Sequence, residues 1–182
     1  KFEKINRLVR KGLARKGIKV VGVIPYNPML SRPTIEQILE ETDFELICGK
    51  EHMERSVSQV IVGAMEPHDA VKHIVEDSLM IPPGDREDIV MTVLGCFRDS
   101  DENRLKVSGI VLSGGITPDT AIMNLLHKAQ IPVLLSKSDT YDVATTVHDL
   151  TVKIRPCDTD KISAVVSLIK DNVDLDTILR GM

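Results

Sequence analysis

Short apolar runs alternate with helical repeats through the middle of the chain. The runs are rich in Val, Ile and Leu and stop at Pro, Gly or Ser, which predicts buried strands at residues 60–62, 78–82, 107–112 and 131–135. Apolar residues recur at helical spacing after each run, which predicts helices at residues 67–75, 86–97, 118–129 and 139–150. Connections of this length place the strands parallel, with helices covering the sheet. The pattern therefore predicts a three-layer α/β fold with a mostly parallel sheet.

The inward face of the first of these helices is expected to carry Ala70, Val71, Ile74 and Val75. The polar stretch at residues 99–104 is expected to be an exposed loop, and we assign it no function.

The two ends of the chain differ from this middle part. Residues 1–17 have the pattern of an amphipathic helix with a basic face, and the β-branched run 19–24 predicts a strand. A further helix is expected from Pro33 and a short strand at 44–48, then a last strand at 152–155 and a helix capped by Asp158. We expect three segments, at residues 1–30, 31–155 and 156–182. The first looks like the closing part of a domain, because a helix and one strand cannot bury both of their faces alone.

Composition narrows the classes of function. The 182 residues are 42% hydrophobic and 27% charged, as in an ordinary globular protein, but only 3% are aromatic, which disfavours base stacking on single-stranded nucleic acid. Residues 1–19 hold eight Lys and Arg against one Glu, whereas the rest holds 15 basic against 26 acidic residues. An acidic body argues against duplex binding, and we expect the basic helix face to be solvated rather than bound to nucleic acid or a membrane. With no apolar run long enough to cross a bilayer, we expect a cytoplasmic protein.

No sequence pattern indicates catalysis or a metal. The three cysteines have no CxxC spacing and the five histidines are scattered, so we expect reduced thiols, no metal site and no cofactor. Ser113 lacks the GxSxG surroundings of an activated nucleophile, and no phosphate-binding GxxxxGK[ST] or GxGxxG motif is present.

Three predicted loops share one construction, in which a strand end is followed by small residues and a helix start. The candidate ligand-binding residues in them are Gly84, Asp85, Arg86, Ser113, Gly114, Gly115, Asp139 and Thr140. Helix N-termini offer free N–H groups to an anion, Gly114 and Gly115 allow close approach, and Arg86 offers a two-pronged donor for phosphate or carboxylate. The alternative is that Asp85, Asp119 and Asp139 are ordinary helix caps and that Arg86 pairs with Asp85, Asp88 or another subunit.

The pairing of Gly84-Asp85-Arg86 with Ser113-Gly114-Gly115 resembles the signature of the DRTGG domain family. Other matching stretches extend the resemblance over about residues 31–152, and they are Pro33-Thr34-Ile35, Leu46–Gly49, Val62-Gly63-Ala64-Met65, Ile131–Leu134 and Ser138-Asp139-Thr140-Tyr141. The chain departs from the family at Ser113, where Thr is usual and the hydroxyl is kept, and at Pro82, where Thr is common.

The first segment, through Val21-Gly22-Val23-Ile24-Pro25, is similar to the end of a dethiobiotin synthetase-like P-loop domain. Such domains precede DRTGG domains in phosphotransacetylase-like proteins. The resemblance implies a non-catalytic regulatory module that forms homodimers beside a P-loop or phosphotransacetylase domain and responds to a nucleotide or phosphate effector. The alternative is a part of an acyl- or phosphoryl-transfer enzyme, a phosphate acetyltransferase, whose chemistry lies outside these residues.

Overall fold

The computed structural model describes residues 1–97 and 107–181, and the expected loop at 99–104 lies outside the described residues. The chain forms two compact units. One is the continuous segment Arg32–Val152, and the other combines Lys1–Ser31 with Lys153–Met182.

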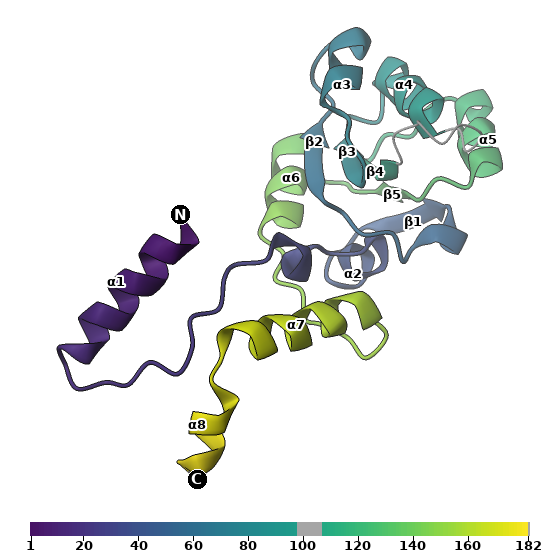
Figure 1. Ribbon diagram of the computed structural model, residues 1–182. Coiled ribbons are helices and arrows are strands. Elements are labelled where there is room, and N and C mark those ends of the chain that lie inside the picture. The colour runs from purple at the N-terminus through teal and green to yellow at the C-terminus, as the bar shows by residue number, and fades with distance from the viewer. Residues whose placement is uncertain (98–106, 182) are drawn as a thin grey trace. The chain divides into compact units, whose positions relative to one another are not determined.

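A five-stranded sheet forms the centre of the unit Arg32–Val152 (Figure 1). Its strands are β1 (Glu45–Cys48), β2 (Gln59–Val62), β3 (Ser78–Ile81), β4 (Val107–Leu112) and β5 (Val133–Leu135). Their spatial order is β1-β5-β4-β3-β2, and β2 through β5 pair in parallel, as the alternation of runs and helices predicts. Strand β1 lies antiparallel to β5 at one edge. The mostly parallel α/β sheet expected from the sequence is confirmed.

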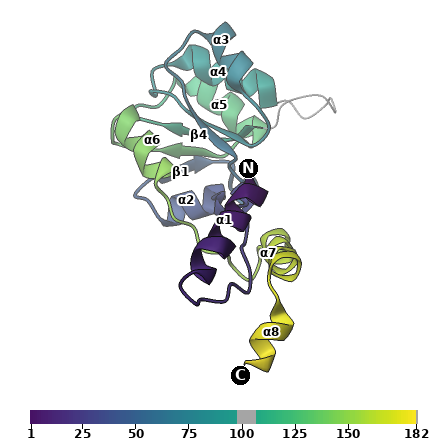
Figure 2. The same cartoon turned by 60° about the vertical axis from the view of Figure 1, so that its left-hand side comes forward.

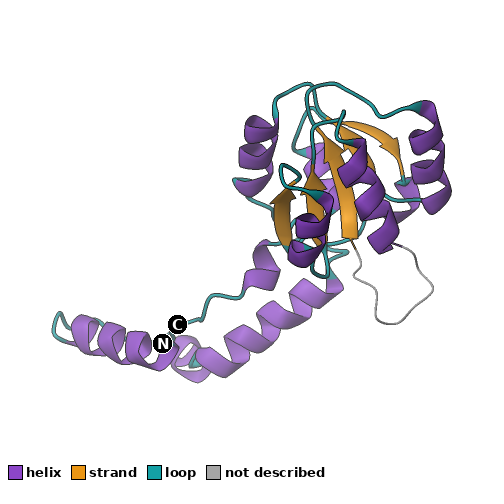
Figure 3. Cartoon of the chain, turned by 90° about the horizontal axis from the view of Figure 1, so that it is seen from above, coloured by secondary structure: helices purple, strands orange, loops and turns teal. Residues whose placement is uncertain are grey.

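Helices cover both faces of this sheet (Figures 2 and 3). One face is packed by α3 (Pro67–His73), α4 (Glu87–Phe97) and α5 (Thr120–Ala129), and the other by α2 (Ile35–Glu40) and α6 (Thr140–His148). Every residue of β3 and β4 is buried, because side chains pointing to either face meet a helical layer.

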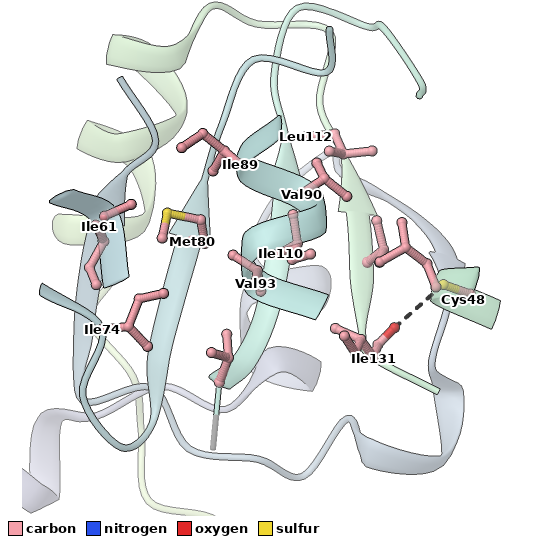
Figure 4. Close-up of a cluster of buried hydrophobic side chains, with 14 residues drawn as sticks. Cys48, Ile61, Ile74, Met80, Ile89, Val90, Val93, Ile110, Leu112 and Ile131 are labelled. Atoms are coloured by element: carbon pink, nitrogen blue, oxygen red, sulfur yellow. Dashed lines mark hydrogen bonds between the residues drawn. The ribbon is translucent and has the colours of Figure 1, made fainter. Parts of the chain in front are cut away.

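Two apolar clusters hold the layers together. The cluster under α3, α4 and α5 includes Met80, Val90, Ile110 and Leu126, and the cluster under α2 and α6 includes Leu79. Figure 4 shows the first cluster, in which the Cys48 thiol donates to the carbonyl oxygen of Ile131 over 3.4 Å. Burial of this thiol raises its pKa from 9.0 to about 11. Cys48 therefore behaves as a neutral core residue.

Helix α3 buries less of its surface than the sequence pattern predicts. Ala70 and Ile74 are buried, as expected, but Val71 and Val75 are exposed, at 42% and 46%. The helix ends at His73, and Ile74 already has an extended backbone. Of these four residues only Ala70 and Ile74 face the sheet, so the prediction that Val71 and Val75 also face inward is wrong.

The second unit contains α1 (Phe2–Ala14), a short 3-10 helix, η1 (Pro28–Ser31), α7 (Thr159–Asn172) and α8 (Leu175–Arg180). The strands expected at residues 19–24 and 152–155 are absent, and that prediction is wrong. Within 19–24, all of which the structure describes, only Gly22 makes a β-bridge, to Val173. The run is extended and β-branched, but a strand also needs a neighbouring strand, and here its neighbour is the junction between α7 and α8.

Contacts between the two ends of the chain hold this unit together. The amide of Asp174 donates to the carbonyl oxygen of Val21 over 2.7 Å, and helix α7 packs on η1. Among its described residues no hydrophobic side chain is fully buried, whereas the unit Arg32–Val152 contains the whole apolar core. None of the helices in the described ranges is long and apolar enough to cross a membrane.

Candidate functional site

The loops that follow the four parallel strands lie at one edge of the sheet (Figure 1). They are residues 63–66 after β2, 82–86 after β3, 113–119 after β4 and 136–139 after β5. Because parallel strands end on the same side, these loops meet at the edge where ligands of open α/β sheets commonly bind. We call this set of four loops the carboxyl edge.

Backbone hydrogen bonds join the loops that the sequence singled out. The amide of Gly84 donates to the carbonyl oxygen of Ser113 over 3.1 Å, and the amide of Ser113 donates to that of Pro82 over 3.0 Å. The hydroxyl groups of Ser113 and Thr140 lie 2.7 Å apart and share a hydrogen bond. The structure therefore places Gly84, Ser113 and Thr140 in one connected network.

Gly114 and Gly115 have a structural task in this network. Both have a left-handed backbone, with φ of 81° and 66°, which other residues adopt only at a cost. Their amides donate over 2.8 Å to the carbonyl oxygens of Ser138 and Ser136, respectively. These two N–H groups are thus bound within the protein.

Arg86 is also bound internally. Its Nε and one terminal nitrogen donate to the two carboxylate oxygens of Asp88, each over 2.9 Å, and that nitrogen also donates to the carbonyl oxygen of Met65 over 2.8 Å. The other terminal nitrogen is 3.4 Å from the carbonyl oxygen of Ala64. The hydrogen bonds that Arg86 donates to Asp88 raise the pKa of Arg86 and lower the pKa of Asp88. An anion at Arg86 would have to replace Asp88.

The acidic residues of the edge fit the capping alternative. The carboxylate of Asp139 accepts from the amide of Asp142 at the start of α6, and that of Asp119 accepts from the amide of Ala121 at the start of α5. Asp85 is exposed. Asp119 and Asp139 are helix caps, and their charge opposes an anion at the same helix starts.

Three further side chains lie in or beside the carboxyl edge, and none of them was among the candidate ligand-binding residues. Glu87 accepts from the amide of Asp119 over 2.8 Å and so joins two loops. Lys137 is an exposed amine whose nitrogen lies 3.7 Å from Glu45 of β1, and Tyr141 is 77% exposed at the start of α6. The helical pattern could have identified Tyr141 as exposed, but no sequence signal pairs Glu87 with Asp119.

The chemistry of the edge gives no nucleophile with a base. The hydroxyl of Ser113, the buried candidate, lies 3.3 Å from the carbonyl oxygen of Pro82 and 2.7 Å from Thr140, and neither partner is a base that removes its proton. Within the described ranges no three His, Cys, Asp or Glu side chains are grouped so as to hold a metal ion. In the part of the edge that the structure describes, the Ser113 hydroxyl is therefore a hydrogen-bonding group without an adjacent base.

Comparison with known proteins gives a family for most of the chain. The sequence model of the DRTGG domain matches residues 37–150. The chain is 27% identical to a phosphate acetyltransferase of Nitratidesulfovibrio vulgaris over 162 residues. The aligned region covers 85% of this chain and 22% of that protein. It is also 28% identical to a phosphate acetyltransferase of Synechocystis over 164 residues, and this aligned region covers 88% of this chain and 23% of that protein. The chain thus spans less than a quarter of the length of these curated relatives.

A solved structure shares the fold. It contains the CBS and DRTGG domains of the regulatory region of a Clostridium perfringens pyrophosphatase, complexed with its activator diadenosine tetraphosphate. The TM-score is 0.53 at 23% sequence identity, and the match covers 79% of this chain and 57% of that one.

Proposed function

Because the chain belongs to the DRTGG domain family, we propose that it is a non-catalytic regulatory module of a phosphate acetyltransferase-like protein. In this proposal the module binds a phosphate-containing effector, a nucleotide in the first place, and passes the signal to a neighbouring enzyme domain. Support comes from the phosphate acetyltransferases that resemble the chain and from the nucleotide activator in the related pyrophosphatase region.

One observation carries the proposal. The carboxyl edge brings the candidate loops together, and the hydroxyl of Ser113 at its centre is bonded to Thr140 and Pro82 with no base in contact. Such an edge suits recognition, because loops positioned by a rigid sheet are well placed to bind a ligand. It does not suit catalysis, which needs an activated nucleophile or a positioned acid and base.

We propose the candidate residues Gly84, Asp85, Arg86, Ser113, Gly114, Gly115, Asp139 and Thr140 as the effector surface. Arg86 and the amides of Gly114 and Gly115 already donate hydrogen bonds within the protein, which limits how an effector can bind to them. A phosphate group must displace Asp88 from Arg86, or it must reach the edge through the exposed amine of Lys137. Asp85 and Asp139 repel a bare anion, so a nucleotide accompanied by a divalent cation suits this surface better.

Calorimetry tests this site directly. The chain is titrated with ATP, diadenosine tetraphosphate, acetyl-CoA and acetyl phosphate, each with and without Mg²⁺. Arg86→Ala and Gly114→Val should weaken binding at least about tenfold, because each alters the edge, whereas Gly95→Ala on α4 should leave it unchanged. Binding that survives both edge changes would place the effector elsewhere.

The names of the similar proteins support one other function. The chain could be part of an acyl- or phosphoryl-transfer enzyme, a phosphate acetyltransferase, whose reacting groups lie in other domains. Neither idea places reacting groups in these residues, so an assay of this chain alone for phosphotransacetylase and ATPase turnover tests the premise that both share. Turnover that is lost in Ser113→Ala would place chemistry at the edge and refute the regulatory proposal.

We further propose that residues 1–30 are the end of a dethiobiotin synthetase-like P-loop domain, that 31–155 are the DRTGG domain and that 156–182 link it to a following domain. The basic, amphipathic α1, with Ile5 47% and Leu8 55% exposed, supports the first assignment, since its apolar side needs a partner. We also propose a homodimer in the cytoplasm. Sedimentation equilibrium of the chain with and without residues 1–30 measures whether Arg32–Val152 carries the association.

A further inference from the structure

Two residues at the junction between the loop after β3 and α4 contact both neighbouring loops. Arg86 donates to the carbonyl oxygen of Met65 over 2.8 Å in the loop after β2. The next residue, Glu87, accepts over 2.8 Å from the amide of Asp119 in the loop after β4. Two consecutive side chains thus fasten the loop after β3 to the loops on both sides of it.

The loop after β4 is fastened in turn to the loop after β5. The amides of Gly114 and Gly115 donate to Ser138 and Ser136, and the hydroxyl of Ser113 meets that of Thr140. The four loops that follow the parallel strands are therefore joined in their spatial order, each to the next.

Steric contact reinforces the middle of this series. Gly84 packs directly on the backbone of Ile116, so closely that a β-carbon on Gly84 would overlap the Ile116 carbonyl group. The loops after β3 and β4 therefore cannot slide past one another without breaking the bond from Gly84 to Ser113.

We infer that the carboxyl edge is one cooperative unit, in which loosening the Arg86 end also loosens the bonds of Thr140 two loops away. Hydrogen-bonded segments with few alternative arrangements transmit free energy between sites that do not touch. Helices α3, α4, α5 and α6 all begin at these loops, so a change at one loop reaches the start of each helix. The inference concerns the fold itself and holds whether or not an effector binds.

A double-mutant cycle tests it. The equilibrium constant of unfolding is measured in urea for Arg86→Met, Thr140→Val and the double variant. If the edge is one unit, the double variant departs from the product of the single effects by about fivefold or more, since the second change acts on a network already loosened. If Arg86→Met does not fold, Glu87→Met takes its place in the cycle. Glu87 is partly exposed, and its substitution removes only the hydrogen bond from the amide of Asp119.

Thr42→Val is the matched control. The Thr42 hydroxyl donates over 2.7 Å to the carbonyl oxygen of Ile38 and accepts over 3.4 Å from the amide of Phe44, so the change again removes a bonded hydroxyl, but away from the edge. Its cycle with Arg86→Met should stay within about twofold of the product.

Hydrogen exchange provides a second readout. In Arg86→Met or Glu87→Met, the amides of Gly114 and Gly115 should exchange about tenfold faster or more, beyond any change at Met80 in β3. The inference would be overturned by two results together. In the cycle with Thr140→Val, the effect of the double variant on the unfolding constant would lie within about twofold of the product of the single effects, and faster amide exchange would be confined to residues 63–88.

Discussion

Gly84 lies against Ile116 with no room for a side chain between them. The two residues belong to consecutive loops of the carboxyl edge, and the amide of Gly84 is bonded to Ser113 in the same neighbouring loop. The glycine is therefore required by the close approach of two backbones.

Gly84→Ala should lower the free energy of unfolding by about 2 kcal/mol or more, because its methyl group meets a backbone carbonyl that has no freedom to move aside. Urea denaturation followed by circular dichroism measures the change. Gly95→Ala is the control, since no described atom lies within 4 Å of the added methyl group and the site is inside α4. That variant should gain about 0.5–1 kcal/mol from the helix preference of Ala over Gly. Equal effects in the two variants would contradict the packing argument.

Arg86→Ala should destabilise the protein more than Asp88→Ala. Both changes break an ion pair that is partly exposed, with side-chain exposures of 29% and 45%, and such pairs contribute about 0.2–1 kcal/mol. Arg86→Ala also leaves the carbonyl groups of Ala64 and Met65 without their donor, which adds about 1 kcal/mol. Chemical denaturation of both variants at neutral pH gives the comparison, and equal losses would mean that the two carbonyl bonds contribute nothing.

The Arg86–Asp88 pair should also depend on pH. The folded state lowers the pKa of Asp88, mainly through the hydrogen bonds from Arg86, so folding favours the carboxylate. Its contribution is complete above the pKa of an unfolded Asp, about 4, and is lost as the pH falls through the lower folded value. The stability difference between the natural chain and Asp88→Asn should therefore shrink as the pH falls below about 4. A difference that stays constant over this range would argue against the pair.

The Cys48 thiol should reduce stability in alkali. Burial raises its pKa from 9.0 to about 11, so the folded state favours the neutral thiol. Its contribution is complete below pH 9 and is lost as the pH rises toward 11, where the unfolded thiol ionises first. Urea midpoints at pH 8 and pH 10.5 should differ more for the natural chain than for Cys48→Ala. As a check by chemistry, the exposed Cys157 should react with a thiol reagent at pH 8 well before Cys48 does.

Gly22→Ala should loosen the second unit. A β-carbon there would lie 2.7 Å from the carbonyl oxygen of Asn172 and 2.9 Å from a methyl group of Val173. The bridge to Val173 should open, and trypsin should then cleave after Lys19 faster than in the natural chain. In the control, Gly12→Ala on α1, the added methyl group meets no described atom within 4 Å. Cleavage at unchanged rate in Gly22→Ala would show that the bridge does not protect the segment.

The sequence was sufficient for the central architecture. Apolar runs such as 78–82 and 107–112 are buried on both faces, so they leave a clear signal between helical repeats. The meeting of the loops at Gly84, Ser113 and Thr140 followed from the parallel strands alone. Strand β1 pairs antiparallel with β5, and its short run has no feature in the sequence that indicates this direction.

The sequence could not show how the polar groups of the edge are used. Arg86 has Asp85 one residue away and Asp88 two residues away, and its spacing does not choose between them and a ligand. In the structure its guanidinium binds Asp88 and the carbonyl groups of Ala64 and Met65. Gly114 and Gly115 read as a cradle for an anion, but their amides reach Ser138 and Ser136 across a gap of more than 20 residues. The failed strand at 19–24 has the same origin, since strand propensity does not supply the neighbouring strand.

The pairing of Val21 and Gly22 with Asp174 and Val173 also fixes an order of events during synthesis. The first half of this unit leaves the ribosome about 150 residues before the second, a delay of roughly 10–30 s at ordinary elongation rates. The segment Arg32–Val152 can complete its sheet within that interval, so the two parts of the second unit pair last, after the sheet has formed.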